Sequence, residues 1–566
     1  MTRSAGQVLL LAAACCAAAI AVHAQSTITV TVDVSANRRA INSNIYGVAN
    51  ATSAQLTDLN APLHRLGGNP ASSYNWSINA ANRGSDWYFE SVGESSATAG
   101  QLGDDFITSS RSGGAQAMVT IPMLDWVAKL GSGRSKLASF SSTKYGTQDD
   151  CDWAFFSTAC NGLHGGVPIT GNDPNDASTP NTDTNGGDWA AHIVGKFGLA
   201  ASGGLRYYVL DNEYSIWHAT HRDVHPAGAG MDEILDKMRR YALRIKGVDP
   251  GAQIVGPEEW GWSGYLLSGA DQQYGGAHGW SNLPDKTAHG NMDYVPWLLQ
   301  QLKAASQANN VHLLDMFSLH YYPQGGEFGD DVSASMQARR NRSTRSLWDP
   351  SYVDETWIAD TVKLIPRMRS WADTYYYAGT PIAITEYNWG AEGNINGGTA
   401  QADVLGIFGR EGLDAAARWG TPATGSPTYN AMKLYRNYDG AKSGFGETSV
   451  KVTSSGNPDS LAVFAAQRSG SSAVTVMVIN KVGSSATVAV TLANTTPGAT
   501  AQVWRVAGTS PIAHLADVAV APTGVAFTGS VPAQSITLYV IPATGGTTPP
   551  PTVPKPPTGL HIIPAG

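Results

Sequence analysis

Residues 207–213 read Tyr-Tyr-Val-Leu-Asp-Asn-Glu, and residues 382–387 read Ile-Ala-Ile-Thr-Glu-Tyr. Each is a short apolar run, typical of a buried strand, with a glutamate at or just beyond its end. Six similar runs, separated by helical segments, lie between residues 44 and 440. The eight candidate strands are Asn44–Val48, Leu63–Leu66, Ala117–Leu124, Arg206–Leu210, Gln253–Gly256, Met316–Tyr322, Ile382–Tyr387 and Ala415–Trp419. Eight strands alternating with helices predict an α/β fold, a (β/α)8 TIM-like barrel over residues 44–440.

The helical segments support this interpretation. Residues 231–245 place Met231, Ile234, Met238 and Ile245 on one apolar stripe, and residues 295–308 form a second helical segment. A doubly wound sheet is the alternative. It is disfavoured because no glycine-rich fingerprint follows an early strand.

The sequence pattern changes beyond the barrel. Residues 449–541 alternate apolar and polar positions with period two and are rich in Thr, Val and Ala, which predicts an all-β sandwich over residues 441–543. The expected strands are Leu461–Ala466, Ala473–Ile479, Ala486–Leu492, Ala501–Val506 and Ser535–Val540. The stretch Thr27–Val34 alternates in the same way, so we expect residues 25–43 to add an N-terminal strand to this additional domain.

Both ends of the chain predict segments outside these domains. Residues 1–24 combine Arg3, an apolar run and the small-residue site Val22-His23-Ala24, which indicates a signal peptide and a secreted protein, extracellular or periplasmic in transit. No later stretch is long and apolar enough to predict a membrane span. Residues 544–566 are a Pro/Thr-rich linker and tail.

The cysteines predict one disulfide. Two of the four lie in the signal peptide, which leaves Cys151 and Cys160 in an oxidising compartment, where a disulfide between them is favoured.

Composition limits the class of partner. The formal net charge is -8 with the signs mixed along the chain, so nucleic acid is not an expected partner. Charged residues make up only 14% of the chain, which also contains 16 tryptophans. This balance suits a secreted protein that binds a neutral polar ligand, because flat apolar rings stack on sugar faces. We expect the protein to be a monomer.

Glu213 and Glu386 are the candidate catalytic pair. Hydrolysis of a glycosidic bond needs a proton donor for the leaving oxygen and a carboxylate for the oxocarbenium-like centre. The two glutamates end predicted strands four and seven, and catalytic residues of barrels lie at the carboxyl ends of strands. Asn212, beside Glu213, is suited to bind the sugar 2-hydroxyl.

Three longer motifs carry a family resemblance. They are RLGGNPASSYNW from residue 65, LDNEYSIWHATHRDVHP from residue 210 and ITEYNWG from residue 384. Over residues 27–543 the chain resembles glycoside hydrolase family 44. The resemblance implies a retaining endo-β-1,4-glucanase, often also active on xyloglucan, with Glu213 as acid/base, Glu386 as nucleophile and no required cofactor. Tyr214 stands where the family commonly has Pro.

Neighbouring residues are expected to support this pair. Arg65 at the end of strand two is placed to orient the nucleophile, with a structural ion pair as the alternative. His320 and Tyr322 share one face of strand six, so Tyr322 rather than Tyr321 is expected to donate to Glu386. Glu258 and Glu259 are the main rivals for a catalytic role, but adjacent residues face opposite sides of a strand, so at most one enters the site. We expect that one to be a substrate-binding or supporting acid, with a purely structural role as the alternative.

Tryptophans after strand ends are candidate sugar-stacking platforms, although a buried structural tryptophan is equally common. We expect about half of them to contact sugar, first Trp389 and Trp419, which would flank the cleavage point, and Trp76 is a further candidate. Trp126, Trp260 and Trp262 hold similar positions.

Two other patterns suggest metals without fixing ligands. His218, His221 and His225 have zinc-like spacing, but no HExxH glutamate accompanies them, so a structural role is favoured. Asp149, Asp150, Asp152 and the acidic, Asn-rich stretch Asn172–Asp188 suit a structural calcium. The metal ligands therefore remain unknown.

Two further functions remain open from sequence alone. A xylanase or mannanase would use the same catalytic pair, and a non-catalytic polysaccharide-binding protein would keep only the binding residues. The two intact glutamates disfavour the second alternative.

Overall fold

The computed structural model describes residues 27–544 and contains a closed barrel of eight parallel strands. In chain order the barrel strands are β3 (Gly47–Ala49), β4 (Leu63–Leu66), β7 (Gln116–Ile121), β13 (Tyr207–Leu210), β14 (Gln253–Glu259), β15 (Met316–Tyr321), β16 (Ile382–Tyr387) and β17 (Ala415–Arg418). Each predicted run supplies one of them, so the predicted barrel is confirmed. Most of the runs differ from the strands by one to three residues at an end, and in the first run residues 43–46 form a 3-10 turn, η1, before β3.

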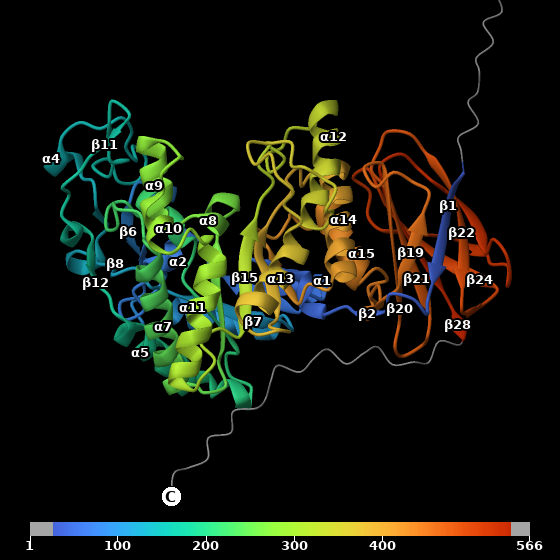
Figure 1. Ribbon diagram of the computed structural model, residues 1–566, viewed down its shortest axis with the longest axis horizontal. Coiled ribbons are helices and arrows are strands. Elements are labelled where there is room, and N and C mark those ends of the chain that lie inside the picture. The colour runs from blue at the N-terminus through green and yellow to red at the C-terminus, as the bar shows by residue number, and fades with distance from the viewer. Residues whose placement is uncertain (1–26, 545–566) are drawn as a thin grey trace, which may run out of the picture.

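Helices surround this barrel (Figure 1). The longer ones are α1 (Ser53–Leu59), α3 (Gln101–Ser112), α5 (Asp183–Phe197), α7 (Met231–Val248), α9 (Gly269–His278), α11 (Tyr294–Asn309), α12 (Ala334–Ser343), α13 (Leu364–Tyr375), α14 (Ile395–Glu411) and α15 (Pro427–Arg436). Helix α7 buries the stripe predicted from its spacing, including Met231, Ile234 and Met238. Leu63, Met118 and Val255 belong to a separate apolar cluster contributed by strands around the barrel.

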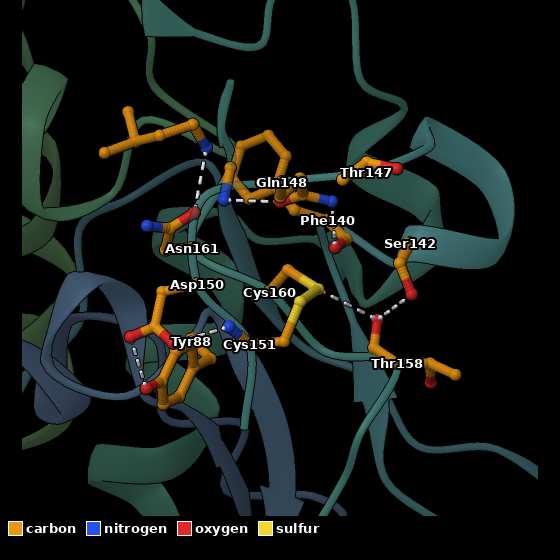
Figure 2. The surroundings of a disulfide bond; sticks show 12 residues. Tyr88, Phe140, Ser142, Thr147, Gln148, Asp150, Cys151, Thr158, Cys160 and Asn161 are labelled. Carbon is orange, nitrogen blue, oxygen red and sulfur yellow. Dashed lines mark hydrogen bonds between the residues drawn. A yellow bond between two sulfur atoms is a disulfide. The ribbon is translucent and has the colours of Figure 1, made fainter. Parts of the chain in front are cut away.

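Long segments follow β4 and β7 and carry small sheets of their own. Their strands are β5 (Ala80–Asn82), β6 (Glu90–Gly93), β8 (Trp126–Ala128), β9 (Leu137–Ala138), β10 (Leu163–His164), β11 (Val167–Pro168) and β12 (Ser178–Pro180). Cys151 and Cys160 are bonded in the second of these segments (Figure 2), which confirms the predicted disulfide.

The second domain is a sandwich of two sheets beside the barrel (Figure 1). The smaller sheet has the order β19 (Lys451–Ser454), β1 (Ile28–Asp33), β22 (Ala486–Ala493) and β26 (Phe527–Val531). The larger has the order β2 (Arg39–Ala40), β18 (Thr448–Ser449), β20 (Leu461–Gln467), β21 (Val474–Asn480), β27 (Ser535–Ile541), β24 (Thr500–Ala507) and β25 (Ala513–Ala519). Strand β1 pairs with β22 and β19, so the N-terminal segment joins the sandwich as predicted.

Three of the longer sandwich strands were not predicted. Strand β25 is almost wholly exposed, so it lacks the apolar alternation that marks a strand, and β19 is only half-buried. Strand β26 contains Gly529, where a side chain would collide with the hydroxyl of Tyr539. The edge positions of β19, β25 and β26 explain their weak patterns.

Helix α14 packs against this sandwich. Gly406 lies against the ring of Phe464 so closely that any side chain there would overlap the ring. Lys481, just after β21, forms a buried ion pair of 2.7 Å with Asp403 on α14. Barrel and sandwich therefore share a close-packed interface.

No helix within residues 27–544 has the length and apolarity that crossing a membrane requires. The predicted signal peptide and the Pro/Thr-rich tail beyond residue 544 lie outside the described residues.

Candidate active site

Glu213 and Glu386 reach one site from strands that lie apart in the barrel order. Glu213 follows β13 in a tight turn in which both Asp211 and Glu213 have left-handed backbone angles, with φ of 55° and 48°. Its amide donates to the carbonyl of Glu258, which ties the turn to β14. Glu386 lies within β16, directly opposite His320 of β15. Single oxygens of the two glutamates lie within 4.8 Å of each other and of a His320 ring nitrogen.

Arg65 of β4 holds Glu386 in place. Its guanidinium is fully buried and donates from Nη1 to Oε1 of Glu386 over 2.6 Å, and from Nη2 to Oε2 of Glu258 over 3.0 Å. Gly67, two residues further on, leaves the room for this, because a Cβ there would lie 2.5 Å from the guanidinium. The hydroxyl of Tyr322 donates to the other oxygen of Glu386 over 2.9 Å. Both oxygens of this carboxylate are thus hydrogen-bonded, as predicted for Arg65 and Tyr322.

His320 joins Glu213 to Glu258. Its Nδ1 lies 2.9 Å from Oε1 of Glu213 and its Nε2 lies 3.0 Å from Oε2 of Glu258. Burial disfavours the charged ring, but the negative charge of Glu386 and the hydrogen bonds to Glu213 and Glu258 prevail and raise the pKa of His320 to about 10. We therefore assign a cationic imidazolium that donates to both carboxyls.

Glu258 is a buried carboxylate that contacts Arg65 and His320. Its side chain is fully buried behind His320 and also accepts a hydrogen bond from Ser318. Burial alone would raise its pKa, yet Arg65 and His320 lower the pKa of Glu258 to about 2. These contacts and its burial favour the supporting interpretation of Glu258 over the substrate-binding one.

Glu259 points away from this cluster, as expected for adjacent residues of a strand. It accepts a hydrogen bond of 2.6 Å from Ser215, in the turn that follows Glu213. Burial raises the pKa of Glu259 to about 8, so this carboxyl is mostly protonated at neutral pH.

Burial likewise raises the pKa of Glu213, with the charge of Glu386 adding to the rise and the His320 hydrogen bond opposing it. A protonated Glu213 also balances the cluster. Arg65 and His320 are positive while Glu258 and Glu386 are negative, so the site is neutral when Glu213 carries its proton. A buried cluster with no net charge avoids the large cost of an uncompensated charge.

Comparison with known proteins assigns this arrangement to a family. The family model of glycoside hydrolase family 44 matches residues 80–325. CelM2, a bifunctional glucanase-xylanase from a metagenome library, is 60% identical in sequence to this chain. Its solved structure superposes with a TM-score of 0.90, and the match covers 92% of this chain and 99% of CelM2. The chain belongs to glycoside hydrolase family 44.

Two other relatives of this family 44 chain are informative. A Paenibacillus polymyxa xyloglucanase of family 44, solved with xyloglucan, is 28% identical, covers 92% of this chain and 100% of its own, and has a TM-score of 0.76. Endoglucanase A of Paenibacillus lautus is 33% identical over 482 residues, or 81% of this chain. The chain spans only 64% of the length of that curated relative.

Asn212, Trp419 and Trp76, which were predicted to bind substrate, differ in burial and in the groups that they contact. Asn212 is buried and accepts from Nη2 of Arg65 over 3.1 Å. Trp419 is half-buried with the Arg65 guanidinium 5.9 Å from its ring centroid, a position compatible with sugar stacking. Trp76 is also half-buried, and its indole donates to the carbonyl of Asn185.

The expectation for Trp389 is wrong. Only 2% of its surface is exposed, so neither ring face is open to a sugar. Its ring packs 5.7 Å from that of Tyr321, and its indole donates to Ser343. Trp389 packs against Tyr321 and Tyr387, the last residues of β15 and β16, which is the structural alternative for a tryptophan in a large barrel.

Sequence reasoning missed Ser318 and Phe328. Ser318 shares a strand face with His320 and Tyr322, and this period-two spacing was the available signal. Phe328 lies in the loop after β15, is 51% exposed and packs edge-on at 5.4 Å against Tyr322. No local pattern marks that position.

The metal expectations gain no support from the residues that the structure describes. Within residues 27–544, the one group of three clustered His, Cys, Asp or Glu ligand atoms is Glu213, His320 and Glu386. Arg65 and the cationic His320 leave no favourable place there for a metal ion. In the same described range, the acidic stretch between 149 and 188 and the three spaced histidines form no such group.

Proposed function

We propose that this protein is a secreted, retaining endo-β-1,4-glucanase that cuts internal bonds of cellulose-type glucans and of xyloglucan. The observation that carries the proposal is the approach of Glu213 and Glu386 to within 4.8 Å, one oxygen from each. Retaining glycosidases hold their two carboxyl groups about 5–5.5 Å apart, whereas inverting enzymes leave about 6.5–9.5 Å for a water molecule.

In the first step Glu386 attacks the anomeric carbon while Glu213 protonates the leaving oxygen. Arg65 and Tyr322 fix both oxygens of Glu386 by hydrogen bonds, so the nucleophile needs little reorganisation to attack. Glu213, with its raised pKa, holds the proton that the departing sugar requires.

The second step reverses the role of Glu213. Ester formation removes the charge of Glu386 at the same time as Glu213 becomes an anion, so the net charge of the cluster does not change. Loss of the Glu386 charge lowers the pKa of Glu213, because that charge contributed to its rise. Glu213, held by the imidazolium of His320, then acts as the base that activates water.

Glu258 serves both steps as a permanent anion. With a pKa of about 2 it remains charged at any working pH and keeps His320 cationic and Arg65 in place. A carboxylate that stays charged and buried cannot transfer a proton to substrate, so these properties favour Glu213 and Glu386, rather than Glu258, as the catalytic residues.

Relatives support the choice of substrate. The family 44 structure solved with xyloglucan and the endoglucanase of Paenibacillus lautus point to β-1,4-glucans. A second activity, on xylan, is favoured by the 60% identity to the bifunctional glucanase-xylanase CelM2.

Substrates compared side by side test the proposal. Reducing ends released from carboxymethyl cellulose, xyloglucan, xylan and mannan are measured with one enzyme preparation, and glucans should give the highest rates. NMR of early products should show the β-anomer first. An α-anomer, or activity confined to mannan, would contradict the proposal.

Export is tested at the N-terminus. If residues 1–24 are a signal peptide that is cleaved during export, N-terminal sequencing of the protein recovered from the medium or periplasm should begin at Gln25. A secreted product that still carries Met1, or a protein retained in the cytoplasm, would count against it.

A further inference from the structure

Exposed aromatic rings gather beside the disulfide. Trp87 is 44% exposed and Phe155 is 73% exposed, with 6.4 Å between their ring centroids. Tyr88 packs edge-on at 5.4 Å against Trp87. We call these three residues the aromatic platform. Single exposed apolar residues are normal, but apolar side chains that form a contiguous exposed surface often mark a binding site.

The buried carboxylate of Asp152 holds two members of the aromatic platform in place. One oxygen of Asp152 accepts the indole N–H of Trp87 over 3.2 Å, and the other accepts the backbone amide of Phe155 over 3.1 Å. Tyr88 donates to Asp150 over 2.8 Å, next to the bonded Cys151 (Figure 2). Side chains that are fixed before binding lose less entropy when a ligand arrives.

A chain of hydrogen bonds links this surface to the catalytic residues. Asn212, bonded to Arg65, donates to Asn69 over 3.3 Å, and Asn69 donates to Asp86 over 2.9 Å. Asp86 is followed directly by Trp87. The pKa of Asp86 is raised by burial and by the charge of Glu386, so Asp86 lies within electrostatic reach of the nucleophile.

We propose that the aromatic platform binds distal glucosyl units of the β-glucan chain whose cleavage is assigned to Glu213 and Glu386, and this inference rests on the proposed function. Aromatic faces pack on the apolar faces of β-linked sugars, while Asp86 and Asp150 offer acceptors to the hydroxyls at their edges. Because hydrogen bonds connect this surface to the residues around Glu386, we take a glucan chain that extends from the catalytic residues as the occupant.

Kinetics with substrates of two lengths test this assignment. Trp87→Ala/Phe155→Ala should raise KM for polymeric xyloglucan about 10-fold or more, because each lost stacking contact weakens binding. The same variant should keep wild-type kcat and KM on an aryl cellobioside, which occupies only units next to the cleaved bond. Unchanged KM on the polymer would overturn the proposal, as would equal losses on both substrates.

Two control variants separate stacking from other effects. Trp87→Phe keeps a flat ring without the indole N–H and should recover most of the polymer affinity. Leu199→Ala removes an exposed apolar side chain, 39% exposed, from the connection that enters the amino end of β13. It should change neither substrate's kinetics. A loss of polymer affinity in Leu199→Ala as large as that in Trp87→Ala/Phe155→Ala would contradict the role of the aromatic platform.

Direct binding distinguishes this inference from the proposed function. In the Glu386→Gln background, retardation in gels that contain xyloglucan should weaken when Trp87 and Phe155 become Ala. If the wild-type protein cuts glucans but this retardation is unchanged, the aromatic platform alone is refuted. A protein that neither cuts nor is retarded refutes both.

Discussion

Arg65 brings together side chains from different parts of the barrel. It donates to Glu386 of β16, to Glu258 of β14 and to Asn212 beyond β13. Full burial strengthens these charge-assisted bonds and makes their geometry insensitive to solvent. At the scale of single residues, the charges of the site balance one another, so replacing any one of these charged side chains would leave a buried charge without its partner.

Replacement of the two glutamates should affect substrates differently. Glu386→Gln should abolish cleavage of every substrate, since no nucleophile remains. Glu213→Gln should slow polysaccharide cleavage about 10²–10⁴-fold but spare glycosylation by aryl glycosides, whose leaving groups need little protonation. Azide added to Glu213→Ala should yield a β-glycosyl azide. An α-glycosyl azide, or full activity of Glu386→Gln, would show that the roles are wrongly assigned.

Glu259 should govern alkaline stability. Its pKa rises from 4.5 to about 8 on folding, so its favourable contribution is present below pH 4.5 and is lost as the pH rises towards 8. His320, raised from 6.5 to about 10, acts in the same direction at higher pH. Glu259→Gln should therefore make the protein more stable than wild type near pH 8, by on the order of a few kcal/mol.

Urea unfolding at pH 5 and pH 8 measures this difference. Glutamine matches the volume of the protonated acid, so the substitution leaves no cavity that would mask the effect of charge. If wild type and Glu259→Gln lose stability in parallel between the two pH values, the carboxyl is not the group responsible.

At the scale of elements, the segment after β7 is stabilised by its disulfide. The two cysteines are separated by 9 residues of sequence, and for so short a loop chain-entropy arguments give about 2–3 kcal/mol. Only that local segment, far along the chain from Glu213 and Glu386, is constrained. The strand ends themselves are fixed by barrel hydrogen bonds.

Cys151→Ser/Cys160→Ser should lower the free energy of unfolding by about this amount, 2–3 kcal/mol, in thermal or urea denaturation. The rate on an aryl cellobioside should remain that of the wild type. A peptide map of the unreduced protein should show the two cysteines linked. Two free thiols in the native protein would contradict the bond.

At the scale of the whole molecule, the sandwich and the barrel form one packed unit. Lys481 contributes a buried charge that Asp403 on α14 neutralises, with 1% and 4% of the two side chains exposed. Thr344 also donates to Asp403, which places the pair in a polar network within an apolar interface.

Lys481→Met should destabilise the protein by about 3–5 kcal/mol, because Asp403 stays buried without its partner. Lys481→Met/Asp403→Leu should recover most of the loss, since replacing both charges with apolar groups is often neutral. Calorimetry measures both, and kcat should be unchanged throughout. Equal destabilisation of the single and double variants would mean that packing, rather than charge, dominates there.

The sequence by itself predicted the barrel, the sandwich and the two glutamates, Glu213 and Glu386, that the structure brings together. The eight strand runs are buried and local, and the glutamates at the ends of runs four and seven follow from barrel topology alone. His320 and Tyr322 were predictable together because strand periodicity fixes which side chains share a face.

Tertiary structure alone decided the exposure of each ring and the partners of each charge. Trp389 follows its strand just as Trp419 does, yet one ring is buried and the other half-open. The aromatic platform joins Trp87 and Phe155 across 68 residues of chain, held by one carboxylate. Local sequence carries no record of such contacts, because they depend on how distant segments pack once the strands have closed into a barrel.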